Sequence, residues 1–233
     1  MAQTNTSVKT SSKQLYGYQK DALQEIFRRF EDAPKDYHLL YQLPTGGGKT
    51  VIFSEIVRRY LETFQKKVLV LTHRIELSKQ TSKMLSEFGV ANKIINSTAK
   101  LDDQSQFGCF VAMVETLKNR LNDEKLDISD IGLVIVDEAH SVAHTVDKRG
   151  GKHLRFELVK GLAEDETRHL VLVTATPHSG KEDAFHSLLS ILKEDFAHLP
   201  DDLTGQHNET VRRELSQYFV QRRRKDIESF ADE

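Results

Sequence analysis

Short apolar runs rich in β-branched residues alternate with longer amphipathic stretches along most of the chain. The pattern predicts strands at Leu39–Leu43, Lys67–Thr72, Lys93–Ile95, Cys109–Val114, Leu133–Asp137 and His169–Thr174. It predicts helices at Gln19–Phe30, Val51–Thr63, Ile75–Phe88, Glu115–Leu121 and Leu154–Leu162. Strands that are apolar almost throughout are typical of a parallel sheet buried on both faces. We therefore expect an α/β fold with three layers, α/β/α, around a mainly parallel sheet.

Three segments fall outside this alternation. Met1–Lys13 is polar and rich in Ser and Thr, which predicts a disordered tail and not a signal peptide. Ser141–His153 contains two glycines and several basic residues, and predicts a mobile surface loop. Beyond Leu192 the chain becomes charged, and a helical pattern over Glu209–Phe230 has no strand after it. The chain thus divides into a tail at 1–13, one domain at 14–195 and a charged helical extension at 196–233.

The composition is that of an ordinary soluble protein, with 38% hydrophobic and 29% charged residues among 233. The net charge of −2 provides no general basic field, so nucleic acid must be bound through local patches and backbone groups. Cys109 is the only cysteine, which excludes an internal disulfide and a multi-cysteine metal site. No apolar run approaches the ~18 residues of a membrane span, and a cytoplasmic protein without membrane contact is expected.

The segment Leu43–Thr50, LPTGGGKT, lies between a predicted strand and a predicted helix. This order is the context of a phosphate-binding loop. The glycines Gly46, Gly47 and Gly48 allow N–H groups to point at phosphate oxygens. Lys49 would reach the β- and γ-phosphates, and the Thr50 hydroxyl would help to hold Mg²⁺. A glycine-rich turn without a ligand is the alternative, and Leu43 stands where the generic pattern has glycine, but the Gly-Lys-Thr ending favours a nucleoside-triphosphate site.

Asp137 and Glu138 come directly after the apolar run Leu133–Val136, at the carboxyl end of a strand. Asp137 is placed to bind Mg²⁺ through a water, and Glu138 to polarise the water that attacks the γ-phosphate. Two acids at a strand end are, taken alone, more typical of a solvated turn. Because Lys49 lies upstream with room for intervening β/α units, the catalytic interpretation is favoured.

Thr174, Ala175 and Thr176 end another apolar strand and are followed by Pro177. One interpretation is a β-turn closed by the proline. The other is a hydroxyl-rich link between the hydrolysis site and a second surface, and the residues alone favour neither.

The segments PTGGGKT, DEAH and TATP, in this order and spacing, resemble those of the nucleic-acid-dependent ATPases of helicase superfamily 2. The resemblance covers roughly residues 14 to 195 and implies a RecA-like, P-loop ATPase domain that uses ATP and Mg²⁺, with Thr45 also in the nucleotide loop. It implies that Gln19, in Leu15–Gln19, binds the adenine edge and that Tyr16 stacks on the base. Coupling between hydrolysis and movement would pass through Thr174, Ala175 and Thr176.

The same resemblance assigns nucleic-acid contacts to two strand-to-helix turns, formed by Thr72, His73 and Arg74 and by Glu115 and Thr116. Free N–H groups and the helix dipole attract phosphate at such turns, where contacts follow the backbone without reading bases. Capping of the following helices by Thr72 and Thr116 is an alternative that can hold at the same time.

Different parts of the chain resemble different branches of the superfamily. Residues up to His140 are most similar to DEAH-type helicases of DNA repair and restriction, whereas His169–Leu192 resembles bacterial Swi2/Snf2-type translocases. The basic run Gln221–Lys225 resembles a segment near the end of the first lobe of those translocases, although a solvated helix face explains it equally well. Movement along duplex DNA is therefore better supported than unwinding.

Superfamily 2 motors bind ATP between two RecA-like lobes, and the second lobe supplies arginines that stabilise the transferring phosphoryl group. The chain ends at Glu233, about where a second lobe would begin. Two functions follow: the first lobe of a DNA helicase or translocase, with the second lobe and DNA (more than RNA) as partners, or a stand-alone nucleotide-gated nucleic-acid-binding module. A P-loop kinase or transporter ATPase is disfavoured by the DEAH and TATP segments.

Overall fold

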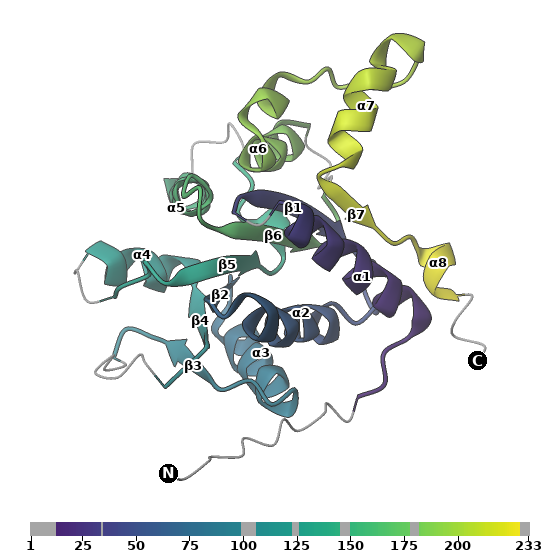
Figure 1. The fold of residues 1–233 in the computed structure, drawn as a ribbon. Coiled ribbons are helices and arrows are strands. Elements are labelled where there is room, and N and C mark those ends of the chain that lie inside the picture. The colour runs from purple at the N-terminus through teal and green to yellow at the C-terminus, as the bar shows by residue number, and fades with distance from the viewer. Residues whose placement is uncertain are drawn as a thin grey trace.

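A seven-stranded parallel sheet forms the centre of the fold (Figure 1). The computed structural model describes residues 13–33, 35–98, 106–122, 126–144, 150–177 and 182–228. The strands lie in the order β3-β4-β2-β5-β6-β1-β7. Their bounds are β1 Tyr37–Gln42, β2 Lys67–Thr72, β3 Asn92–Ile95, β4 Cys109–Met113, β5 Ile131–Val136, β6 His169–Thr174 and β7 Phe219–Gln221. The six strands expected from the sequence are confirmed, with bounds shifted by at most two residues.

Helices cover both faces of the sheet. The eight α-helices of the described residues are α1 Gly17–Asp32, α2 Lys49–Phe64, α3 Ile75–Glu87, α4 Val114–Asn122, α5 Gly150–Ala163, α6 Glu182–Leu192, α7 Glu209–Ser216 and α8 Arg224–Glu228. Successive strand residues enter different cores, because Val68 and Val70 pack with α1, α2 and α3, whereas Leu69 and Leu71 pack with α4, α5 and α6. The three-layer α/β/α architecture is therefore confirmed.

The helix expected over Glu209–Phe230 is wrong. This stretch forms α7, the strand β7 and the short helix α8. Val220 is buried, and β7 pairs in parallel with β1 at the edge of the sheet. Burial and backbone pairing against β1 outweigh the helical pattern of the charged residues on either side. The charged segment therefore contributes a strand to the same sheet, and the division of the chain at residue 195 stays a prediction.

The surface loop expected over Ser141–His153 is also partly wrong. A 3₁₀ turn covers Ala139–Ser141, and α5 begins at Gly150, within the expected loop. Residues 145–149 and the tail at 1–12 lie outside the described residues. In the described part of the chain, no helix combines the length and apolar character needed to span a membrane.

A buried histidine stands at the amino end of the sheet, opposite the edge where the strands end. His169 Nδ1 lies 2.9 Å from the Tyr60 hydroxyl and Nε2 lies 2.8 Å from the Ala33 carbonyl oxygen, while the Phe30 ring stacks on the imidazole. Burial lowers the pKa of His169 below its usual 6.5. The folded protein therefore holds the neutral ring, whereas the unfolded chain binds a proton below pH 6.5.

We predict that the contribution of His169 to the free energy of unfolding falls as the pH is lowered from 7.5 to 5.5, because its proton binds preferentially to the unfolded chain. The variant His169→Gln, which cannot titrate, should be less stable at pH 7.5 but should lose less stability on acidification. Urea unfolding at both pH values measures this difference. His38 and Asp36 form a nearby pair that both proteins share, so the comparison isolates the substitution at position 169. An identical pH dependence in the two proteins would contradict the assignment.

Candidate nucleotide-binding site and nucleic-acid surface

The parallel strands bring the sequence-predicted residues together at the carboxyl ends of the strands. Gln42 at the end of β1 lies beside Thr174 at the end of β6, and Val136 at the end of β5 lies beside Leu71. The loops that follow these strands carry the phosphate-binding loop, Asp137 with Glu138, and the Thr174–Thr176 segment. Ligands of open α/β sheets collect at this carboxyl edge.

The loop after β1 has the backbone shape of an anion cradle. Gly46 and Gly48 have φ angles of +86° and +77°, which residues with a side chain rarely adopt. The N–H of Gly47 donates to the Pro44 carbonyl at 3.0 Å and closes the turn. α2 begins at Lys49, and no side chain caps its amino end. Its free N–H groups and its dipole are therefore available to phosphate oxygens.

Lys49 and Glu138 meet directly across the site. Lys49 Nζ lies 2.9 Å from Glu138 Oε1, and both side chains are partly exposed. Glu138 adopts a left-handed conformation with φ of 50°, uncommon for a residue other than glycine, and this conformation is a feature of functional turns. The ammonium group predicted to bind phosphate and the carboxylate predicted to polarise water are thus held within contact distance.

Asp137 is the buried acid of the pair. Only 6% of the residue is exposed, and its Oδ1 accepts the N–H of Glu138 at 2.9 Å. Burial, with a smaller effect of the Glu138 charge, raises the pKa of Asp137 from 3.8 to about 6, against the opposing charge of Lys49. A divalent cation beside this carboxylate would favour its ionised form. The carboxylate of Asp137 and the hydroxyl of Thr50 are oxygen donors suited to Mg²⁺.

No cluster of three metal-ligating side chains occurs among the described residues. Mg²⁺ commonly binds proteins through one or two oxygen donors and completes its shell with water and substrate phosphates. The sparse donor set of Asp137 and Thr50 therefore fits Mg²⁺ carried on a nucleotide better than a dedicated protein cage.

The amino end of α1 is attached to the phosphate-binding loop. The Gln19 side chain is buried, accepts the N–H of Tyr16 at 3.0 Å and donates to the Gly47 carbonyl at 3.4 Å. Tyr18 donates its hydroxyl to the same carbonyl at 3.0 Å. The Tyr16 ring stacks on Tyr18. Because Tyr16 is exposed, its ring is also accessible to a base. Sequence reasoning overlooked Tyr18, although it stands beside Gln19 in the same segment.

His140 connects the acidic pair to the Thr174–Thr176 segment. Its Nδ1 lies 3.2 Å from the Thr174 hydroxyl and 3.4 Å from Glu138 Oε2. The buried Thr174 hydroxyl also accepts the N–H of Thr176 at 3.1 Å. His140 was not among the predicted site residues, although it completes the DEAH segment. A chain of polar contacts therefore runs from Glu138 to the TATP turn.

The turn after β2 presents two basic side chains, whereas its threonine is buried. Thr72 places its hydroxyl 2.6 Å from the Ser78 hydroxyl, and only 1% of the residue is exposed. The cap position of α3 is Arg74, with no side-chain cap bond, so Thr72 is not the helix cap. Arg74 is exposed and His73 is half-buried. Burial, followed by the charge of Arg74, lowers the pKa of His73.

A cavity of about 490 Å³ joins this turn to Glu138. Its lining includes His73 and Arg74 on one side and Glu138 and His140 on the other. On α4, Glu115 forms an ion pair with Arg155 of α5, and Thr116 is half-buried. The two predicted nucleic-acid turns thus differ, because the first opens toward Glu138 while the carboxylate of the second is engaged by α5.

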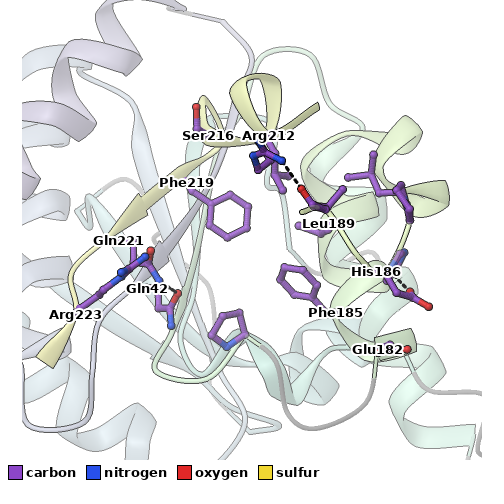
Figure 2. A pocket seen from close by; sticks show the side chains of 16 residues that line it. Gln42, Glu182, Phe185, His186, Leu189, Arg212, Ser216, Phe219, Gln221 and Arg223 are labelled. Atoms are coloured by element: carbon purple, nitrogen blue, oxygen red, sulfur yellow. Dashed lines mark hydrogen bonds and ion pairs between the residues drawn. The ribbon is translucent and has the colours of Figure 1, made fainter. Parts of the chain in front are cut away.

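A larger cavity of about 700 Å³ lies between α6, α7 and β7 (Figure 2). Phe185 of α6 and Phe219 of β7 face each other across it. It contains none of the predicted site residues, although its wall includes Gln42, directly before the phosphate-binding loop, and Pro177, the last residue of the TATP segment. The larger of the two cavities is therefore not the one that contains Glu138.

Comparison with known sequences decides the family. Residues 12–179 match the family described as the res subunit of type III restriction enzymes. The chain belongs to this family. Within the res-subunit family it is a superfamily 2 helicase domain, the first RecA-like domain, and an ATP-hydrolysing enzyme domain.

Relatives of this res-subunit domain include proteins named as helicases. IRC3 of Saccharomyces cerevisiae, named as an ATP-dependent helicase, is 35% identical over 143 residues, which are 58% of this chain and 20% of that protein. The helicase POLQ-like protein of Homo sapiens is 26% identical over 149 residues, which are 60% of this chain and 13% of that protein. The chain therefore spans a fifth or less of the length of these relatives.

The fold of the res-subunit domain is shared with solved structures. The Sulfolobus solfataricus SWI2/SNF2 ATPase core in complex with dsDNA superposes with a TM-score of 0.69 at 15% identity, over 92% of this chain and 46% of that chain. At this identity the likeness shows the fold alone, and it confirms the RecA-like α/β class.

Proposed function

We propose that this chain binds MgATP and forms the first lobe of a DNA-dependent motor, which hydrolyses ATP to move along DNA when a second RecA-like lobe completes the site. The observation that carries the proposal is the contact of Lys49 with Glu138 beside a phosphate-binding loop that leads into the uncapped amino end of α2. A cation that can bind phosphate and a carboxylate that can polarise water, side by side after the carboxyl ends of two strands, fit the transfer of a phosphoryl group to water.

Each residue of the site has a role in this proposal. Lys49 and the N–H groups at the start of α2 bind the β- and γ-phosphates. Asp137 and Thr50 hold the cation, which neutralises phosphate charge when bound. Glu138 accepts a proton from the attacking water. Gln19 and Tyr16 hold the base, and the exposed Tyr16 ring is the one accessible for stacking.

Nucleic acid is assigned to the turns formed by Thr72–Arg74 and by Glu115 and Thr116. The shared cavity of Arg74 and Glu138 supports communication between nucleic acid and hydrolysis at the first turn. The buried hydroxyl of Thr72 is better suited to holding the turn through Ser78. DNA is proposed as the track in preference to RNA, since the sequence resemblance favours movement along duplex DNA over unwinding.

We predict that Lys49→Ala weakens MgATP binding by roughly 10- to 100-fold, because it removes a charge-assisted contact to phosphate. Isothermal titration calorimetry with a non-hydrolysable ATP analogue measures this loss. Lys83→Ala, on the exposed surface of α3, is the matched control and should bind as the unaltered chain does. Equal affinity of the Lys49→Ala and Lys83→Ala variants would refute the site assignment.

A further inference from the structure

The segment after α7 returns to the phosphate-binding loop. β7 pairs with β1 directly before that loop, and the N–H of Arg222 donates to the Gln42 carbonyl at 2.9 Å. The Gln221 amide donates to Gln42 Oε1 at 2.7 Å, and Figure 2 shows these two side chains meeting beside Arg223. Arg222 also lies 3.6 Å from Glu25 of α1. The chain is therefore fastened to the strand that leads into the nucleotide loop.

α8 then places an apolar side chain on the loop itself. A Cβ atom built on Gly47 would lie 3.0 Å from Ile227 Cδ1 and 2.8 Å from Leu43 Cγ. Gly47 is therefore enclosed between Leu43 and Ile227, with no room for a side chain of its own. Ile227 is partly buried against the core on the α1 and α2 face of the sheet. The contact joins the loop to a residue that follows it by most of the length of the chain.

Gly47 is also held by α1. Its carbonyl accepts hydrogen bonds from Tyr18 and Gln19. The turn at Gly47 is thus held by two elements. α1 makes polar contacts with it, and α8 makes an apolar contact. The flanking glycines provide little stiffness of their own, because glycine has more backbone freedom than any other residue.

We propose that α8 is part of the nucleotide site, with Ile227 as a positioning residue that holds the Gly47 turn in its phosphate-accepting shape. The inference rests on the proposed function, since it concerns the same site. Without Ile227 the loop samples more conformations, and nucleotide binding must then order it, which weakens affinity. By linkage, nucleotide binding must in turn strengthen the docking of α8 on the loop.

Two measurements test the proposal with MgADP as the probe. Calorimetry should show that Ile227→Ala raises the dissociation constant roughly three- to tenfold, the cost expected for ordering a loosened segment. Ile227→Leu, which keeps an apolar contact, should remain within about twofold of the unaltered chain. Lys225→Ala, an exposed position of the same helix, is the matched control. Hydrogen exchange of the Arg222 and Asp226 amides, which donate to Gln42 and Arg223, should slow when MgADP binds.

A double-mutant cycle tests the contact itself. Gly47→Ala introduces a methyl group against Leu43 and Ile227 and should weaken MgADP binding. The same change should cost less in an Ile227→Ala background, because one of the two obstructing neighbours is gone.

The outcomes separate this inference from the function on which it rests. If the unaltered chain binds no more MgADP than Lys49→Ala does, the proposed function fails and this inference fails with it. If the unaltered chain binds MgADP, but Ile227→Ala binds equally well and exchange in α8 is unchanged by nucleotide, this inference alone is overturned.

Discussion

Glu138→Gln is expected to abolish ATP hydrolysis while keeping nucleotide binding. The amide cannot take a proton from water, and loss of a general base typically lowers the rate roughly 100- to 10,000-fold. The variant should bind MgATP at least as tightly as the unaltered chain, because Lys49 no longer has to leave the Glu138 carboxylate, 2.9 Å away, to reach phosphate. Phosphate release with a second RecA-like lobe added measures the first effect, without nucleic acid and with duplex DNA or RNA. Calorimetry on the same preparations measures the second.

The control for this variant is Glu76→Gln, another acid on the wall of the cavity shared with Arg74. It should change hydrolysis little, because Glu76 lies on α3 and does not contact Lys49. Hydrolysis at the normal rate by Glu138→Gln would remove Glu138 from the proposed mechanism. Lost binding with this variant would instead assign Glu138 to nucleotide affinity.

Asp137→Asn should weaken Mg²⁺-dependent nucleotide binding roughly 10- to 100-fold, the cost typical of removing a group that orders a metal site. Binding measured in EDTA should be similar in the variant and the unaltered chain, because neither then has a cation to lose. A calorimetric titration with and without Mg²⁺ makes the comparison. An equal Mg²⁺ dependence in both proteins would show that the cation is held elsewhere.

The same substitution should stabilise the chain in the absence of nucleotide. The pKa of Asp137 is raised to about 6 in the folded protein, whereas the unfolded chain keeps the ordinary value of 3.8. Above pH 6, ionisation of the buried carboxyl therefore destabilises the folded state relative to the unfolded chain. The asparagine variant avoids this cost, with a gain of at most about 3 kcal/mol at pH 7.5. The gain should shrink as the pH falls from about 6 toward 3.8, because Asp137 is then protonated in the folded protein while the unfolded chain approaches its own pKa. Urea unfolding at pH 7.5 and 4.5 follows it, and a destabilised variant at pH 7.5 would contradict the origin of the shift.

The fold class could be predicted because the central strands carry their own signal. Strands such as Val68–Leu71 are apolar on successive residues, which only a sheet covered on both faces can bury. The nucleotide loop could be predicted for a similar reason, since a glycine-rich turn between strand and helix is a local feature. Parallel order then places Lys49, Asp137 and Thr174 at one edge without further information.

What the sequence did not show depends on distant contacts. β7 has only three residues, and its strand conformation comes from pairing with β1 rather than from its charged surroundings. Ile227 is a single apolar residue in a basic segment, and only its place against Gly47 gives it significance. His140 reveals its role through its distances to Glu138 and Thr174. The roles assigned to the site residues themselves stay predictions.

Because all strands run in the same direction, their amino ends lie on one side of this domain and their carboxyl ends on the other. Turns entering the strands, such as the one in which Thr167 bonds to Asp165 before β6, all lie away from the nucleotide loop. A dye, a biotin or a surface linker attached at the exposed Glu166 would leave the opposite edge facing solution. The domain can therefore be immobilised in one orientation, with the edge that carries Lys49 and Glu138 presented to nucleotide and DNA.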